Sequence, residues 1–409
     1  MLRSNKTPQV IVLSAGPNGL GVVRGLWLRG VKAGVIGYQP GEPVMYSRLP
    51  VFKQVLTAAN SKDKIEQLTR MLEPYHSQDV VLIATSDWFI SFLDDHRDHL
   101  SKFFRFIIPD RGLTDLFIDK ASEAKAVGGA VPVPKTLYEL PDSAEGLLGA
   151  LRLPIIIKPR SHRHMVLGKK NIQLYDNDQV IEFYDKFGHT LESVIAQEII
   201  EGPDSNLWVC NCSFNRRHEL IGAFVFRRLR LSPPHYGVTS YALSDSNQKV
   251  FDLVAKLGKE LKYSGPAMVE FKYDPRDDDY KFIELNPRLG LVNYFDTRCG
   301  INNVYATYRL SGDGDWRPAS IPRQKDGKIF LSFYEDFYSR RTDGESVGGI
   351  IKDYLSDFFK PHVFIYFAWI DPSPAFGMAW VHSRQILQSI WRKVSRAQSS
   401  VPRQGAKNS

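Results

Sequence analysis

The stretch that decides the fold runs from Gly265 to Arg288 and reads GPAMVEFKYDPRDDDYKFIELNPR. Residues 268–274 and 280–286 alternate in polarity as β-strands do, and residues 275–279 have the composition of a turn. A hairpin centred on Asp277 places Glu270 directly opposite Glu284, and Asn286 lies on the same face as Glu284. The apolar residues expected to pack on the other face are Val269, Phe271, Ile283 and Leu285.

Two carboxylates that face each other on a sheet repel, and a cation between them removes that repulsion. Glu270, Glu284 and the amide oxygen of Asn286 form a set of hard oxygen ligands that suits Mg²⁺, with Mn²⁺ as the alternative metal. The other interpretation is a solvated polar face on which Lys272 is the counter-charge. The hairpin favours the metal site over this solvated face.

The composition indicates a globular protein with more than one domain, since the chain has 409 residues and 43% of them are hydrophobic. Only three cysteines are present, which argues against a disulfide-stapled secreted protein and favours a reducing compartment, the cytoplasm. The most apolar late stretch, residues 363–381, contains Asp371 and two prolines. We therefore expect no transmembrane segment, while association with a membrane surface stays open.

The net charge of +8 does not indicate nucleic acid, because the basic residues are not gathered in a known binding motif. Some of them lie in a polar tail rich in Ser, Gln and Arg, which we expect to be disordered from about residue 395. We expect acidic small molecules as partners, and no nucleic acid.

The first 110 residues have the pattern of a Rossmann-like domain. Apolar strands are expected at residues 9–13, 33–36 and 80–84, and the last is followed by polar residues 85–87 at the strand end, where open α/β sheets bind ligands. The first turn has the spacing Gly16-x-x-Gly19-x-Gly21 rather than the G-x-G-x-x-G of dinucleotide sites. A tight turn is therefore favoured over NAD binding.

Several residues before the hairpin suit a phosphorylated ligand. Lys158 ends a buried apolar strand, where an ammonium is costly unless it meets an anion. Residues 197–202 form a strand that leaves through a glycine, so its backbone edge could contact an adenine and Asp204 a ribose hydroxyl. Arg228 and Arg230 share one strand face, with Arg227 opposite, and suit a phosphate or carboxylate; a cationic surface strand is equally compatible.

In this order the motifs resemble the ATP-grasp superfamily across residues 120–288. Lys120 and Lys158 resemble its two nucleotide-binding lysines, and residues 270–288 resemble its double-magnesium signature. Residues 197–204 resemble its adenine hinge and ribose carboxylate, with Glu198, Ile200 and Asp204 as the corresponding positions.

Within that superfamily the chain is most similar to the carboxylate–amine ligases related to D-aspartate ligase. The similarity rests on Arg228-Leu-Arg230 with the following residues 233–237, on Lys169-Lys170, and on residues 370–374. One departure concerns the loop at residues 160–170, which is basic and nearly free of glycine where many ATP-grasp enzymes close a Gly/Ser-rich loop over the phosphates.

The resemblance implies a mixed fold, α/β and α+β. A Rossmann-like pre-ATP-grasp domain (residues 1–110) precedes a two-lobed ATP-grasp domain (111–315, lobes about 111–190 and 191–315). A partly helical C-terminal extension (316–409) follows.

The resemblance also implies an ATP-dependent ligase that joins a carboxylate to an amine, both amino-acid-like, through an acyl phosphate with release of ADP and phosphate. Lys120 and Lys158 would hold phosphates, and Glu270, Glu284 and Asn286 would hold Mg²⁺. The residues expected to steady the developing charge are Arg228, Arg230 and Arg288. A nucleotide-binding regulator without turnover is the alternative, and a homodimer stays open.

Overall fold

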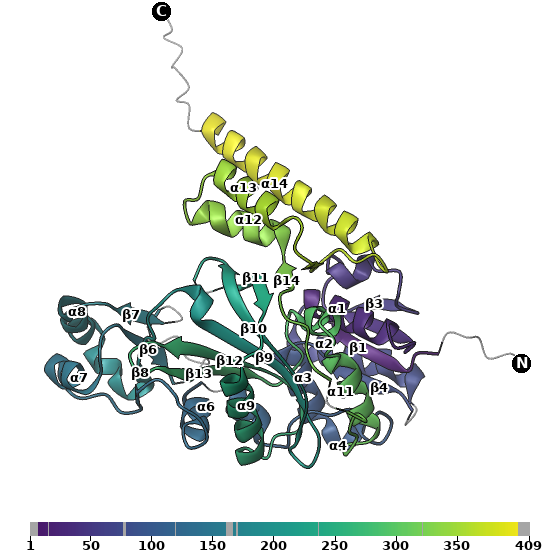
Figure 1. Ribbon diagram of the computed structural model, residues 1–409, viewed down its shortest axis with the longest axis horizontal. Coiled ribbons are helices and arrows are strands. Elements are labelled where there is room, and N and C mark those ends of the chain that lie inside the picture. The colour runs from purple at the N-terminus through teal and green to yellow at the C-terminus, as the bar shows by residue number, and fades with distance from the viewer. Residues whose placement is uncertain are drawn as a thin grey trace, which may run out of the picture.

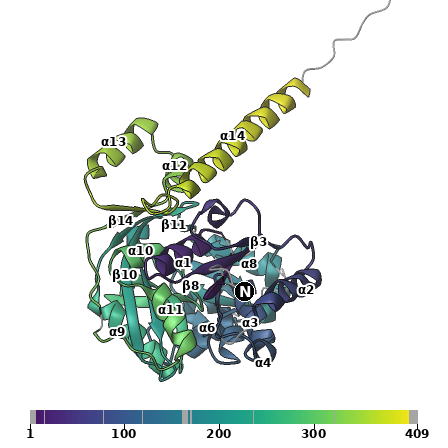
Figure 2. The same cartoon turned by 90° about the vertical axis from the view of Figure 1, so that its right-hand side faces the viewer.

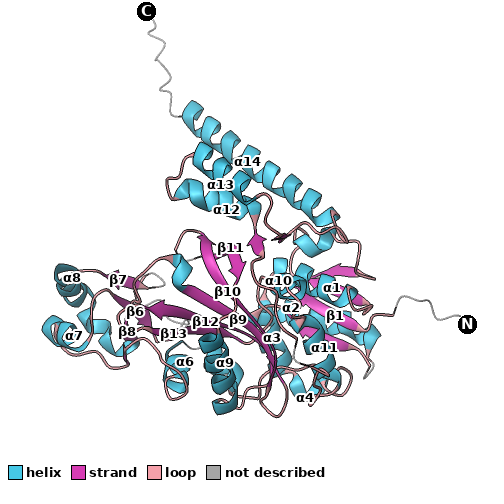
Figure 3. Cartoon of the chain, in the orientation of Figure 1, coloured by secondary structure: helices cyan, strands magenta, loops and turns pink. Residues whose placement is uncertain are grey.

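The computed structural model describes residues 7–14, 16–76, 79–118, 120–160, 167–168, 171–235, 237–320 and 322–399 (Figures 1 and 3). Their strands form one parallel and two largely antiparallel or mixed sheets, and helices accompany each of them. The mixed α/β architecture expected from the sequence is confirmed.

The N-terminal domain is built on a parallel sheet with the strand order β3-β2-β1-β4. Its central strands β1 (Val10–Ser14) and β2 (Ala33–Gly37) are buried along their whole length, as is usual where both faces of a parallel sheet are covered. The turn before α1 contains Gly16, whose φ of 62° favours glycine. The other elements are β3 (Lys53–Val55), β4 (Val81–Ala84), α1 (Pro17–Trp27), η1 (Pro43–Tyr46), α2 (Ser61–Leu72), η2 (Glu73–Tyr75), α3 (Asp87–Asp95) and α4 (Arg97–Leu100).

A small antiparallel sheet with the order β5-β8-β6-β7 forms the next lobe. Its elements are β5 (Thr136–Leu137), α7 (Ala144–Ala150), β6 (Ile155–Pro159), β7 (Ile172–Leu174), α8 (Asn177–Phe187), η3 (Gly188–Ser193) and β8 (Val194–Glu198). The sequence placed the lobe boundary near residue 190, but β8 lies beyond it. The apolar residues of β8 pair with β6 and pack beneath α7 and α8, which makes this strand part of the first lobe.

A seven-stranded sheet with the order β13-β12-β9-β10-β11-β14-β15 forms the second lobe. One face packs against α9 and the other against α10. Strands β14 and β15 come from beyond residue 315, so the C-terminal region completes this sheet instead of forming a separate unit. The elements are α5 (Leu113–Ile118), α6 (Lys120–Val127), η4 (Asp204–Asn206), β9 (Leu207–Phe214), β10 (Leu220–Ser232), β11 (Val238–Ser244), α9 (Gln248–Glu260), β12 (Gly265–Asp274), β13 (Asp279–Asn286), α10 (Asn293–Arg298), α11 (Asn303–Gly312), β14 (Ile329–Leu331) and β15 (His362–Phe364).

Three helices complete the chain: α12 (Phe333–Thr342), α13 (Val347–Asp357) and α14 (Ser373–Ser399). Helix α14 leans on the N-terminal domain at its start and extends beyond the rest of the fold at its end (Figures 1 and 2). The fully buried Arg24 of α1 holds the segment that precedes α14. Its guanidinium donates to Asp371 (3.3 Å) and to the carbonyl oxygens of Ile365 (2.9 Å) and Tyr366 (2.7 Å).

The disordered tail was expected from about residue 395, but α14 is helical as far as Ser399. Residues 400–409 lie outside the described part of the chain. Within the described part, no helix has the length and the apolar content that crossing a bilayer requires.

Candidate active site

The hairpin of β12 and β13 pairs Glu270 with Glu284, as the sequence predicts. The pairing depends on an irregularity that was not predicted. Near the turn Phe271 pairs with Phe282, so Ile283 is an extra residue in β13 that forms a β-bulge. The bulge moves Phe282 into the core and leaves Ile283 38% exposed, so the prediction that Ile283 supplies packing was wrong.

Arg228 faces Glu270 from β10 and forms an ion pair with its carboxylate. Its guanidinium donates two parallel hydrogen bonds, from Nη1 to Oε2 (2.7 Å) and from Nη2 to Oε1 (2.6 Å). Arg228 is 8% exposed and Glu270 is 5% exposed, so this is a buried bidentate ion pair. A carboxylate has about four lone-pair positions, and the two hydrogen bonds from Arg228 use two of them.

Glu284, Asn286 and Arg288 follow one another along the end of the hairpin. The Asn286 amide donates to Glu284 Oε1 (2.9 Å), and its oxygen accepts from Arg288 Nη2 (3.2 Å). Arg288 also donates from Nε to Asp87 Oδ1 (2.7 Å). Asp87 begins α3 directly after β4, so the strand end that the sequence marked as a ligand-binding edge meets the hairpin here.

These side chains gather around one cavity of about 550 Å³. Glu270, Glu284 and Asn286 line it together with Arg228 and Arg288. Asn18 joins them from the start of α1, and its amide donates to the carbonyl oxygens of Thr85 (3.2 Å) and Leu289 (3.3 Å). The glycine-rich turn therefore closes one side of the cavity by packing against the second lobe.

Arg230 does not line this cavity. A register shift between Arg228 and Arg230 in β10 breaks their alternation, and the Arg230 guanidinium pairs with Asp336 of α12 at 2.8 and 2.9 Å. It also lies 3.8 Å from the centre of the Tyr241 ring. The expectation that both arginines act on one ligand therefore does not match the geometry, because Arg230 holds α12 against the sheet.

Lys158 and the start of the hinge (residues 197–204) belong to the small lobe. Lys158 Nζ donates to Gln197 Oε1 (2.7 Å) across the sheet. Ile200 is buried just after β8. The side chain of Lys120, at the start of α6, lies outside the described residues, as does most of the basic loop at residues 160–170.

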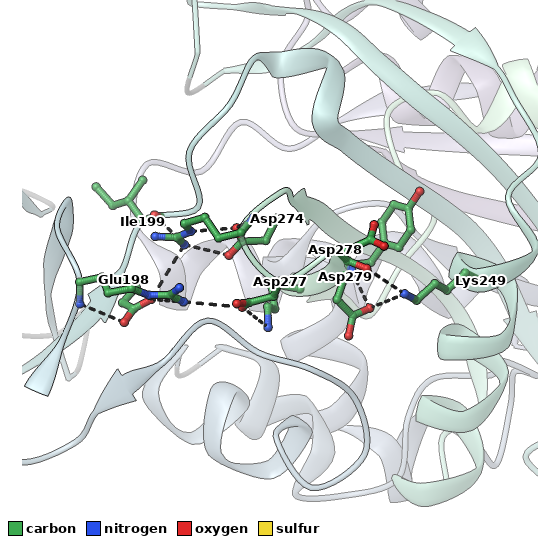
Figure 4. A network of polar contacts seen from close by, with 11 residues as sticks. Glu198, Ile199, Lys249, Asp274, Asp277, Asp278 and Asp279 are labelled. Atoms are coloured by element: carbon green, nitrogen blue, oxygen red, sulfur yellow. Dashed lines mark hydrogen bonds and ion pairs between the residues drawn. The ribbon is translucent and has the colours of Figure 1, made fainter.

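Glu198 belongs to a network of ion pairs between the lobes (Figure 4). Its carboxylate accepts from the backbone N–H (3.0 Å) and Nε (3.1 Å) of Arg152, and Arg276 lies 3.9 Å away. Arg276 in turn pairs with Asp274 at 2.8 Å. Buried and held in this way, the Glu198 side chain joins the hinge to the turn of the hairpin.

Two residues near the hinge were not predicted from the sequence to belong to the site. Lys272 shares a face of β12 with Glu270, and burial lowers the pKa of its ammonium while Asp204, Asp274 and Glu201 act to raise it. The alternation of the strand already placed Lys272 beside Glu270, so this signal was present. The second is His235, which lines the cavity and contacts Asp204 at 3.4 Å; nothing in the sequence marked it.

A buried polar cluster lies behind the cavity. The carboxylate of Asp296, which is fully buried, accepts from the amides of Asn211 (3.3 Å) and Asn303 (3.1 Å). Burial raises the pKa of Asp296 to about 8. Among the described residues, Asn211 Oδ1 has no hydrogen-bond partner. No sequence motif predicted this cluster.

The donor chemistry of the cavity fits a hard divalent cation. Across the described ranges, no three His, Cys, Asp or Glu side chains converge as a metal site. The cavity instead offers two carboxylates and one amide oxygen. Mg²⁺ keeps several water or phosphate ligands and needs few from the protein, so this smaller set is compatible with it.

The chain is similar in sequence to known proteins. Residues 239–296 match the family model of the ATP-binding domain of the carbamoyl-phosphate synthase L chain. A D-aspartate ligase from Enterococcus faecium is 25% identical over 278 residues, which cover 64% of this chain and 66% of that protein, just under two thirds of its length.

Solved structures resemble more than three quarters of the chain. Biotin carboxylase from Campylobacter jejuni, in a complex with an ATP analogue, superposes with a TM-score of 0.60 at 16% identity and covers 78% of this chain and 75% of that one. N5-carboxyaminoimidazole synthetase from Staphylococcus aureus gives 0.55 at 13% identity, with 77% and 79% covered. This chain has the ATP-grasp fold. The family match over the hairpin and the D-aspartate ligase relative show that it resembles the carboxylate–amine ligases of that superfamily.

Proposed function

We propose that this ATP-grasp protein is an ATP-dependent carboxylate–amine ligase that forms an amide or peptide bond and releases ADP and phosphate. One observation carries the proposal: two carboxylates, an amide and two arginines line a single cavity where the hairpin meets the strand ends of the first domain. Such a site can hold a negatively charged ligand and a divalent metal side by side.

Each side chain has a role that its contacts support. Glu270, Glu284 and Asn286 would hold Mg²⁺, which when bound neutralises phosphate charge. Lys158, joined by Lys272, would hold phosphates, with Lys120 proposed from the resemblance alone. Phosphoryl transfer depends on positioning and charge stabilisation more than on a covalent protein group.

The arginines have separate tasks in this proposal. Arg228 and Arg288 face the cavity, where they would steady the acyl phosphate and the oxyanion that forms when the amine attacks. Their positions are fixed in advance by Glu270 and Asp87. We assign Arg230 a supporting role, since its partner is Asp336. The hinge near Ile200 would contact the adenine, and Asp204 the ribose.

The substrates are proposed to be amino-acid-like. A relative that matches part of this chain is a D-aspartate ligase, and Arg228 and Arg288 in the cavity can bind the carboxylate of an amino acid. The cytoplasm is the proposed location, since all three cysteines are buried free thiols.

A screen of amino acids and other carboxylates, in pairs, for release of ADP and phosphate tests the proposal. Turnover with one acid–amine pair, together with ADP as the nucleotide product, is the expected result. Stoichiometric AMP would contradict the acyl-phosphate route. Nucleotide-dependent thermal stabilisation without turnover for any pair would favour the alternative, a nucleotide-binding regulator. Light scattering of the same preparation tests the homodimer.

A further inference from the structure

Large aromatic side chains are exposed on α14 and on the loop before it. Trp369 is 89% exposed, Phe376 73% and Trp380 65%. Phe376 and Trp380 are four residues apart in one helix, so they occupy the same helical face. Exposed aromatic groups of this size on neighbouring positions mark an interaction surface.

The exposed face does not result from a loosely attached helix. A Cβ at Gly377 would lie 2.3 Å from the Tyr46 ring, so α14 crosses η1 at very close range. Met378 is 7% exposed, and His382 stacks on Tyr334 with ring centres 3.8 Å apart. One side of the helix is thus packed on the protein while Phe376 and Trp380 point away from it.

The sequence continues the same apolar spacing toward the end of the helix. Leu387, Ile390, Trp391 and Val394 follow Phe376 at intervals that return to one face of an α-helix. Arg392, Lys393 and Arg396 fall at positions between them. This is the pattern of an interfacial amphipathic helix, with aromatic and aliphatic residues on one face and basic residues on the other.

The charge of this segment has one sign only. No Asp or Glu follows Asp371, whereas residues 384–409 contain six Lys or Arg, which is six of the eight net positive charges of the chain. A second copy of the same segment offers no acidic group to these cations. An anionic lipid surface offers both the negative charge and the apolar depth that the exposed aromatic groups need.

We propose that α14 docks the protein on an anionic bilayer surface, with Phe376 and Trp380 inserted at the level of the headgroups. The helix lies on the bilayer and does not cross it, consistent with the absence of a membrane-spanning helix from the described residues. The far end of α14 extends beyond the other elements, so it can reach a surface ahead of them (Figures 1 and 2). This proposal is independent of the ligase function.

Flotation of the full chain with vesicles tests the proposal. We expect binding to phosphatidylcholine vesicles that contain about 30% phosphatidylglycerol, little binding to pure phosphatidylcholine, and loss of binding in about 0.5 M NaCl. Each basic residue near such a surface contributes about 1 kcal/mol, so Arg392→Gln/Lys393→Gln/Arg396→Gln should lower the partition coefficient on the order of a hundredfold.

Phe376→Ser/Trp380→Ser should also release the protein, and because both side chains are exposed the fold should survive. Trp27→Ser is the matched control, since Trp27 is a 46% exposed tryptophan on α1, and it should bind vesicles normally. Equal binding of the double variant and the wild type would overturn the proposal. The proposal would also be overturned if the wild type did not bind vesicles but instead self-associated or bound nucleic acid, and if the double variant lost that binding.

Discussion

The same substitution should affect protein stability to different extents at the two facing carboxylates of the hairpin. Glu270→Gln removes the charge that pairs with Arg228, and both residues are buried. Breaking a buried ion pair costs about 3–5 kcal/mol. Relief of the repulsion between Glu270 and Glu284 returns at most about 1 kcal/mol. The free energy of unfolding should therefore fall by at least about 2 kcal/mol.

Glu284→Gln should leave the stability nearly unchanged. The variant gains the same relief of repulsion, up to about 1 kcal/mol. It weakens the hydrogen bond from Asn286 (2.9 Å), a loss of about 0.5–1.5 kcal/mol. These two effects nearly cancel. Because the relief of repulsion is common to both variants, their stabilities should differ by about 1.5–4.5 kcal/mol in the absence of ligand.

Binding of MgATP should be impaired in both variants, because each loses one proposed metal ligand. Urea unfolding of the metal-free proteins, followed by tryptophan fluorescence, measures the stabilities, and calorimetry measures the MgATP affinities. A Glu284→Gln protein that is destabilised as much as Glu270→Gln, yet binds MgATP as tightly as the wild type, would refute the metal role of Glu284. It would also remove the main support for the hairpin as a metal site.

Three further outcomes are expected. Calorimetry should show that EDTA abolishes tight ATP binding, and equal affinity with and without metal would contradict the metal assignment. Lys158→Ala should weaken MgATP binding while leaving the melting temperature nearly unchanged. Arg230→Leu should lower the free energy of unfolding by about 3 kcal/mol, because Asp336 is left buried without its cation. The MgATP affinity per folded molecule should be retained, and a loss of affinity without a loss of stability would show that Arg230 takes part in ligand binding. Burial raises the pKa of Asp296 to about 8, so the native state keeps a proton that the unfolded state loses near pH 4, and the free energy of unfolding should fall as pH rises from about 4 to about 8. Urea unfolding at several pH values should show that this free energy depends less on pH in Asp296→Asn than in the wild type. The same pH dependence in both proteins would show that Asp296 is not the group responsible.

The sequence predicted the hairpin because two periodic strands and an acidic, proline-containing turn lie within 24 residues. It did not predict the bulge at Ile283, because one inserted residue leaves the polarity pattern almost unchanged and depends on how Phe282 packs in the core. The prediction that Arg230 faces the cavity was wrong for a similar reason. Alternation along β10 is broken by a register shift, and the partner Asp336 lies more than a hundred residues later.

Elements that are too short or too distant were also missed. Strands β14 and β15 have three residues each, which is too few to show a period. In the structure β14 pairs with β11 and β15 pairs with β14, so their place in the large sheet is a property of the folded chain. The Lys120 and basic-loop predictions stay untested, since their side chains lie outside the described residues.

The first domain is part of the site and not only a neighbour of it. Asn18 ties the turn after β1 to Leu289, and Asp87 ties the end of β4 to Arg288. Both contacts reach the segment that follows the proposed metal ligands, so the strand ends of one sheet set the position of the other. A ligase of this kind needs a wall for the acid and amine opposite the nucleotide. In the proposed ligase the first domain would form that wall, although its glycine spacing, considered alone, suggested only a tight turn.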